Sequence, residues 1–194
     1  LAVPSAYRLE LAPDLDAHTF TGTVEIDIEI LESTSRLVLN SIELTIHSAS
    51  VVIDGTTHTA ATTLDDNAER LTLTLDDEVA AGAATVQVTF DGILNDQLHG
   101  FYRSTYTADD GTDHTIATTQ FQSTDARRCF PCWDEPEYKA TFETTLIVGA
   151  DHLAVTNTSE VAETTLDDGR RRIQYAPTIV MSTYLVAFVV GPLE

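Results

Sequence analysis

The run of residues 21–30 alternates between apolar and acidic side chains along most of its length. The apolar positions are Val24, Ile26, Ile28 and Ile30, and the acidic positions between them are Glu25, Asp27 and Glu29. Successive side chains of a strand point to opposite faces, so this spacing gathers the apolar side chains on one face. The run therefore predicts an antiparallel strand with one buried face, and we interpret its acidic face as solvated rather than as a binding site.

Short runs of β-forming residues recur along the whole chain, with turn residues between them. The predicted strands are 6–11, 21–30, 36–39, 43–47, 50–53, 70–75, 85–90, 101–107, 115–121, 140–148, 154–157, 160–165, 170–175 and 178–190. Asp-Gly pairs, which are typical of hairpin turns, occur at 54–55, 110–111 and 168–169. The run 178–190 is apolar almost throughout, which predicts a strand that is buried on both faces.

The connections between these strands contain little helix. Residues 60–67 and 76–84 are mostly small, polar or acidic, and they predict loops. Residues 124–130 can form one short helix, which Pro131 would end. More than a dozen short strands with one short helix indicate an all-β fold, an antiparallel β-sandwich-like domain that occupies residues 1–194 as a single unit.

The charge balance of the chain excludes several classes of partner. Aspartate and glutamate number 31 against ten lysines and arginines, which gives a net charge of −21. Such a chain lacks the clustered positive charge with which proteins bind nucleic acid or anionic membrane surfaces. The longest apolar run is also too short for a transmembrane helix, which takes about 20 residues. Two cysteines give no disulfide framework, which favours a reducing, cytoplasmic compartment.

The residues least typical of a generic β-protein lie between Thr118 and Tyr138. This stretch contains both cysteines, Cys129 and Cys132, and the only tryptophan. Their C-x-x-C spacing is compatible with a redox pair or with two zinc ligands. However, no thioredoxin-like βαβ pattern surrounds it, and no further cysteine or suitably spaced histidine pair completes a zinc site. We therefore favour two small side chains that pack beside a core aromatic residue.

Three carboxylates surround a proline within residues 134–137 of the same stretch. They could form an acidic catalytic cluster, or they could cap a turn and pair with nearby cations. Arg127 and Arg128 lie only a few residues away. We therefore favour the structural interpretation.

Taken together, residues 119–136 (TQFQSTDARRCFPCWDEP) are more specific than any of their parts. They resemble the signature T-Q-x-E-x-x-x-A-R-x-x-F-P-C-x-D-E-P in the N-terminal domain of the M1 family of zinc aminopeptidases. Further segments are similar to that family in the same order along the chain. These segments are 4–9, 20–24, 100–104, 136–142 and 181–188. The resemblance therefore covers the chain essentially from end to end.

The resemblance assigns roles to two glutamines, Gln120 and Gln122, which the alternation of this segment places on the face opposite Phe121. In the family, the residue at Gln120 lines the pocket for the first side chain of the substrate. Gln122 stands where most members have a glutamate that helps to hold the α-amino group of the substrate. An amide oxygen pairs with an ammonium group more weakly than a carboxylate does. Without the resemblance, both glutamines would be interpreted as strand amides that hydrogen-bond neighbouring backbone.

The same resemblance implies zinc-dependent removal of N-terminal residues from peptides by a catalytic domain that is absent from this chain. The family's zinc-binding motif H-E-x-x-H and its amine-binding loop G-x-M-E-N do not occur in the sequence. We therefore expect that the chain has no catalytic residue, binds no metal and is inactive alone. Its expected partners are peptide N-termini and the catalytic domain of the same polypeptide.

Three hypotheses follow for the role of the chain. It could be the substrate-gripping N-terminal domain of a zinc aminopeptidase, or a non-catalytic β-sandwich interaction scaffold derived from one. It could also be a free-standing acidic β-sandwich that binds a partner. The first requires an intact zinc motif downstream, the second a degraded one, and the third a reading frame that ends near Glu194.

Overall fold

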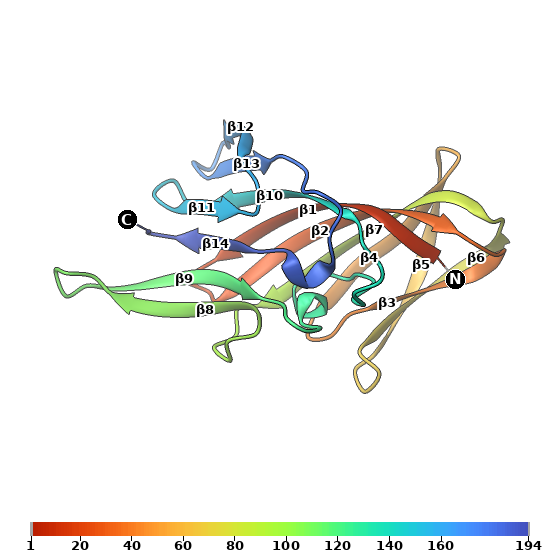
Figure 1. Cartoon of the computed structure of the whole chain (residues 1–194), viewed down its shortest axis with the longest axis horizontal. Helices are drawn as coiled ribbons and strands as arrows, with labels where there is room; N and C mark the ends of the chain where they lie inside the picture. The colour runs from red at the N-terminus through yellow and green to blue at the C-terminus, as the bar shows by residue number, and fades with distance from the viewer. Residues whose placement is uncertain (1, 194) are drawn as a thin grey trace.

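The structure is a computed structural model that describes residues 2–193, and it consists of two β-sheets with almost no helix (Figure 1). The larger sheet has ten strands in the order β12 (Glu160–Thr165), β13 (Arg171–Tyr175), β10 (Thr141–Val148), β1 (Ala2–Asp14), β2 (Thr19–Ile30), β7 (Gly82–Ile93), β4 (Thr45–Ile53), β5 (Thr56–Asp65), β6 (Arg70–Val79) and β3 (Thr34–Asn40). The smaller sheet has four strands in the order β11 (Leu153–Thr156), β14 (Phe188–Gly191), β9 (Asp113–Gln120) and β8 (Gly100–Thr107). The all-β, sandwich-like class predicted from the sequence is confirmed.

The strand with the clearest alternation, β2, behaves as predicted. Its apolar side chains are at most 3% exposed and belong to the core. The acidic face is less simply solvated than expected, because Arg8 on β1 contacts two of its carboxylates. The Arg8 guanidinium lies 2.9 Å from Glu25 and 2.7 Å from Asp27. Hydrogen bonding to Arg8 holds the pKa of the Asp27 carboxyl below its usual range.

A chain of aromatic rings joins the two sheets. Phe20 on β2 meets Phe101 on β8 edge to face at 5.1 Å, and Phe101 meets Phe188 on β14 at 4.9 Å. Phe121, just after β9, lies 6.2 Å from Phe188 and 6.0 Å from Phe130. These rings are at most 3% exposed. Edge-to-face contacts of this kind add about 0.5–1.5 kcal/mol each beyond their buried area, so they fix how the small sheet sits on the large one.

One glycine, Gly92, leaves room for the first of these rings and supports a prediction. A Cβ atom at Gly92 would lie 2.2 Å from the Phe20 ring, and the ring is fully enclosed. We expect Gly92→Ala to destabilise the protein by about 1–3 kcal/mol, the usual cost of overpacking a core. Gly149→Ala is the matched control, because its Cβ would meet the half-buried His152 at 3.1 Å. Thermal unfolding that ranks Gly149→Ala as the more damaging change would contradict this account.

Three predicted boundaries are wrong in the part of the chain around β4 to β7. Residues 60–67 were expected to form a loop, but most of them belong to β5. Residues 76–84 were also expected to form a loop, but they largely extend β6 and β7. Residues 43–47 and 50–53 were expected to be separate strands, but a single strand, β4, covers most of both. In β5 the side chains are small, polar and mostly exposed, so backbone pairing with β4 and β6 holds the strand without a hydrophobic pattern.

The predicted strand 178–190 is wrong for most of its length. Only β14 at its end is a strand, and a short 3-10 turn, η2 (Thr183–Leu185), precedes it. Ile179 and Val180 are 83% and 62% exposed, so this segment is not buried on both faces. Upstream of β14, the Thr178 N–H donates to the backbone carbonyl of Phe142 at 3.0 Å, and Ala140 and Met181 exchange two backbone hydrogen bonds.

The larger sheet is mixed rather than purely antiparallel. β1 pairs in parallel with β10 from Ala6 opposite Thr141 to Leu11 opposite Leu146. The short helix predicted near 124–130 is a single 3-10 turn, η1 (Ala126–Arg128). No helix within residues 2–193 is long and apolar enough to cross a membrane.

Candidate functional site

The two glutamines lie at the end of strand β9. Gln120 is the last residue of β9, where it pairs with Gly100 at the start of β8, and Gln122 follows in the connection to η1. Both side chains are exposed, whereas Phe121 between them is only 1% exposed. The buried ring therefore anchors this end of the strand, and the two amides are accessible to a ligand or to another domain.

The segment after Gln122 is fixed by Arg127, whose side chain is only 11% exposed. Its Nε donates to Asp134 Oδ2 at 3.0 Å, and its Nη2 donates to the backbone carbonyl of Asp134 at 3.1 Å. Its Nη1 donates to Glu69 Oε2 at 2.9 Å. Burial opposes the charge, but the hydrogen bonds and charges of these two carboxylates outweigh it and hold the pKa of Arg127 above its ordinary value.

Asp134 connects Arg127 to two other parts of the chain. The carboxylate is 0% exposed, and its Oδ1 accepts a hydrogen bond of 2.6 Å from Thr183 Oγ1 in η2. Its backbone N–H donates to Asn40 Oδ1 at the end of β3 at 3.1 Å. Asn40 also exchanges two backbone hydrogen bonds with Cys132. The buried pair therefore ties together η1, η2 and one edge of the larger sheet.

Arg128 extends this network of ion pairs to the backbone that lies opposite Gln120. Its guanidinium pairs with Asp125 at 2.8 Å and with Glu43 at 2.5 Å. Its Cβ lies 2.9 Å from the position that a Cβ at Gly100 would take, and Gly100 has a φ of +68°. A glycine is required there because the backbone opposite Gln120 passes directly against Arg128.

This network has a structural rather than a catalytic character. Both guanidinium groups already hold carboxylates, so they do not form an open anion site. Both oxygens of Asp134 accept hydrogen bonds and are enclosed, so this carboxylate cannot reach a substrate. The structural interpretation of the acidic cluster is supported for Asp134. Sequence reasoning missed Glu43 and Glu69, which pair with the two arginines, and Thr183, which bonds Asp134, because no sequence pattern links these distant positions to η1.

The two cysteines are free, fully buried thiols. Burial raises the pKa of each thiol well above its ordinary value, and the nearby Asp134 carboxylate raises that of Cys132 further. A reactive cysteine needs an accessible thiolate, so this environment fits packing and not redox chemistry. We expect almost no reaction of the native protein with a thiol-specific disulfide reagent, and reaction of both thiols in denaturant. Fast labelling of the native protein would contradict the packing interpretation.

The residues described here do not fit a zinc ion. Within residues 2–193, no group of three or more histidine, cysteine, aspartate or glutamate side chains is arranged to hold a metal. The C-x-x-C pair is enclosed and has no partner ligands within that range.

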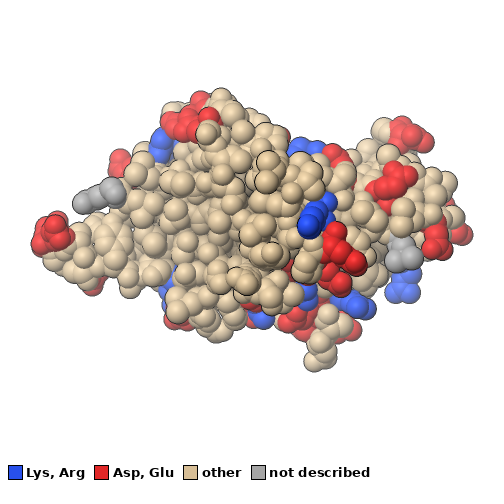
Figure 2. All heavy atoms as spheres, viewed as in Figure 1, with Lys and Arg blue, Asp and Glu red and all other residues tan. Residues whose placement is uncertain are grey.

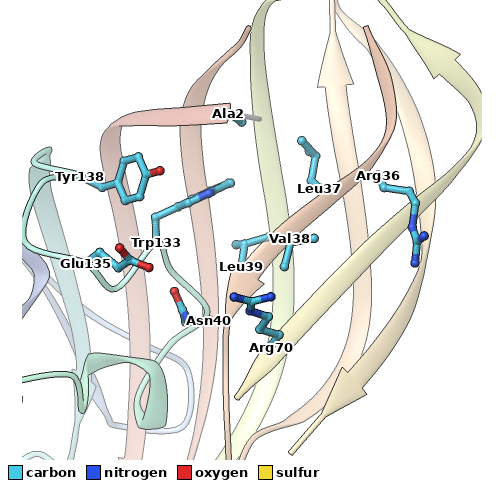
Figure 3. Close-up of a pocket in the computed structure, with 10 residues that line it drawn as sticks. All are labelled: Ala2, Arg36, Leu37, Val38, Leu39, Asn40, Arg70, Trp133, Glu135 and Tyr138. Atoms are coloured by element: carbon cyan, nitrogen blue, oxygen red, sulfur yellow. The ribbon is translucent and has the colours of Figure 1, made fainter. Parts of the chain in front are cut away.

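A hollow of about 310 Å³ lies between β3 and the loop that follows η1 (Figure 3). Trp133, Glu135 and Tyr138 face it from the loop, and Arg70 faces it from the start of β6. Neither glutamine lines it. The hollow and the glutamines are therefore separate features of the domain.

Comparison with known proteins gives a consistent result over the whole chain. The family model described as "Peptidase M1 N-terminal domain" matches residues 3–185. The chain is 43% identical over 195 residues to aminopeptidase M1 of Arabidopsis thaliana, an alignment that covers 98% of this chain and 22% of the relative. It is 40% identical over 196 residues to the puromycin-sensitive aminopeptidase of Caenorhabditis elegans, with 100% and 21% covered. The alanine/arginine aminopeptidase of Saccharomyces cerevisiae is 39% identical over 194 residues, with 98% and 22% covered. The chain thus spans about a fifth of the length of these curated relatives.

Proposed function

The chain belongs to the peptidase M1 N-terminal domain family, and we propose that it is the substrate-gripping first domain of a zinc-dependent aminopeptidase. In this proposal residues 1–194 form one β-domain, and the zinc and the catalytic residues lie in another part of the same polypeptide. That part removes N-terminal residues from peptides. The observation that carries the proposal is the match to the family model from residue 3 to residue 185. The identity of about 40% to three named aminopeptidases supports it.

The contribution of this domain to the reaction would be binding and orientation. We propose that Gln122 accepts a hydrogen bond from the α-ammonium group of the substrate and that Gln120 lines the pocket for its first side chain. The exposure of both amides and the burial of Phe121 between them support this, because a side chain anchored in the core positions the residues on either side of it. When bound elsewhere in the polypeptide, zinc supplies an activated water for peptide hydrolysis.

The cellular setting follows from the same proposal. We propose a cytoplasmic protein, because its two cysteines are unpaired and buried rather than joined in a disulfide. The net charge of −21 makes nucleic acid and anionic membranes poor partners, so the proposed ligands are cationic peptide N-termini.

The decisive experiment is to read the coding sequence for a few hundred codons beyond position 194. A G-x-M-E-N loop followed by H-E-x-x-H and a further glutamate would support the aminopeptidase. A downstream domain with degraded zinc ligands would replace it with a non-catalytic scaffold. A frame that closes near this position would leave only a free-standing, partner-binding β-domain.

A further inference from the structure

The positive charges of this acidic chain are few, and most of them are held in ion pairs. Within residues 2–193, seven of the ten lysine and arginine side chains pair with carboxylates, and the three that do not are Arg36, Arg70 and Lys139. All three are exposed. On the face drawn in Figure 2, lysine and arginine side chains are sparse and acidic ones are spread widely. A place that gathers unpaired arginines is therefore exceptional on this surface.

Two of these unpaired cations, Arg36 and Arg70, line the hollow of about 310 Å³ beside β3 (Figure 3). Arg36 lies two residues before Val38 on β3, and Arg70 lies opposite Asn40, two residues after Val38. Residues at even spacing on one strand, and residues directly opposite each other on two strands, share a face of the sheet. Both guanidinium groups are therefore available to anionic groups placed on either side of Val38.

The loop after η1 supplies the other wall of the hollow, with Trp133, Glu135 and Tyr138. Trp133 is only 7% exposed, so its ring is held by the core, and Tyr138 is half-buried. Rings held in this way offer apolar contact area at little cost in conformational entropy. Glu135 is exposed and repels an acid on the loop side, so the acidic groups of a ligand are directed to the strand side.

The backbone of β3 is open to this hollow at Val38. β3 is the last strand of its sheet, and at its end Asn40 exchanges two backbone hydrogen bonds with Cys132 across the outer edge. The N–H and C=O of Val38 point to the same edge, because it lies two residues from Asn40. The loop does not continue the pairing, since the Asp134 N–H bonds the Asn40 side chain instead. Among residues 2–193 the outward backbone groups of Val38 have no backbone partner. Such an edge is a template for another strand.

We propose that this hollow is a second peptide-binding site, which takes an extended acidic segment of another protein as an added strand on β3. The backbone of the segment bonds Val38, and its acidic side chains pair with Arg36 and Arg70. The segment leaves the sheet at Asn40, where Cys132 occupies the edge, and there it packs on Trp133. Backbone bonds thus supply affinity, and the two arginines supply the selectivity for acidic sequences.

This site is distinct from the proposed substrate contacts. Neither of the two substrate-binding glutamines lines the hollow. Its two arginines also repel the ammonium group of a peptide N-terminus, which is the group that the proposed function requires the domain to hold. The inference therefore does not rest on the proposed function, and each can fail without the other.

The test uses the full-length protein and the peptide acetyl-EVEVE-amide as the probe. Its glutamates alternate, so they share one face of an extended chain. The acetyl group removes the free α-amino group, so the peptide cannot use the proposed contact with Gln122. Isothermal titration calorimetry should show saturable binding of one peptide per protein chain.

Matched variants show whether the peptide occupies the hollow. Arg36→Gln and Arg70→Gln should each weaken binding by about tenfold, the loss expected for one charged hydrogen-bonded pair. Neither arginine holds an ion pair within residues 2–193, so both variants should fold. The control is Arg170→Gln, which removes the same charge near Asp14, whereas the hollow lies at Ala2, the other end of β1. Screening by salt should keep the control within about twofold of the unmodified protein.

Further readouts test the mode of binding. An N-methyl group on the central glutamate keeps every charge of the peptide but removes one backbone donor, and it should also weaken binding. Equal affinity of the methylated peptide would overturn strand addition. No saturable binding, or equal weakening by Arg170→Gln, would overturn the site. Competitive inhibition of aminoacyl hydrolysis by acetyl-EVEVE-amide would place the peptide at the catalytic centre and overturn it equally. Arginine-dependent binding in a protein without aminopeptidase activity would support the site and reject the proposed function.

Discussion

Replacement of Arg127 by methionine is expected to destabilise this domain by about 3–5 kcal/mol, the cost of removing one partner of a buried ion pair. Methionine keeps most of the length of the side chain but removes the guanidinium donors to Asp134 and Glu69. The Asp134 carboxylate, which is 0% exposed, would then be buried without a cation. Thr183 and the backbone N–H of residue 127 each donate one hydrogen bond to it, and these do not compensate for a buried charge.

The matched control is Arg172→Met. Arg172 also pairs with a carboxylate, Glu10 at 2.8 Å, but its side chain is 40% exposed. Exposed ion pairs contribute about 0–1 kcal/mol, so the control should change the denaturant midpoint little. Equal losses of unfolding free energy for the two variants would show that burial does not decide the strength of the Arg127 pair.

A second substitution tests whether the loss comes from the unpaired charge. Adding Asp134→Leu to Arg127→Met removes the stranded carboxylate together with its partner. Apolar replacement of both members of a buried pair is often nearly neutral, whereas removal of one is not. The double variant should therefore unfold at a higher denaturant concentration than Arg127→Met alone. A lower midpoint would show that the bonds of Asp134 to η1 and η2 matter more than its charge.

The sequence was informative wherever a local pattern decides the structure. The alternation in β2 was enough to predict a strand with the correct buried face, because one hydrophobic side of a sheet imposes a period of two. The Asp54-Gly55 turn was predictable for a similar reason, since both residues adopt the positive φ that such pairs tolerate. Neither feature depends on distant contacts.

Other features depend on distant partners and left no local pattern. The parallel pairing of β1 with β10 joins segments more than 100 residues apart, and nothing in either segment specifies its neighbour. The apolar run around Ile179 was interpreted as buried because the sequence shows hydrophobicity, not what covers it.

In the candidate site, too, a local pattern predicts some features and leaves others undetermined. Alternation around Phe121 predicted the two glutamines on the face opposite the ring, and in the structure the ring is buried while both amides are exposed. The roles of Gln120 and Gln122 came only from the family resemblance, and they stay a prediction. Exposure makes both side chains available, but it does not identify what they bind.

The substitution Gln122→Glu in the full-length protein is expected to lower KM for substrates with a free α-amino group by about tenfold, with little change in kcat. The ammonium group is charged in both variants, so the gain is the Coulomb attraction of the added carboxylate, about 1 kcal/mol at 4 Å in water and more where water is partly excluded. The gain of about 1–1.5 kcal/mol corresponds to roughly a factor of ten in affinity. Steady-state kinetics on an aminoacyl substrate measures it directly.

The control must separate a contact with the ammonium group from a general effect of added negative charge. Thr63→Glu adds the same charge at an exposed position on β5, away from the end of β9. Attraction through solvent is screened by salt over a distance of about 8–10 Å, so this variant should leave KM nearly unchanged at physiological ionic strength. If Thr63→Glu lowers KM as much as Gln122→Glu does, the effect is long-range steering and Gln122 does not contact the substrate. If neither variant changes KM, the amine-binding role of this position is wrong, although the aminopeptidase assignment could still hold through residues outside this domain.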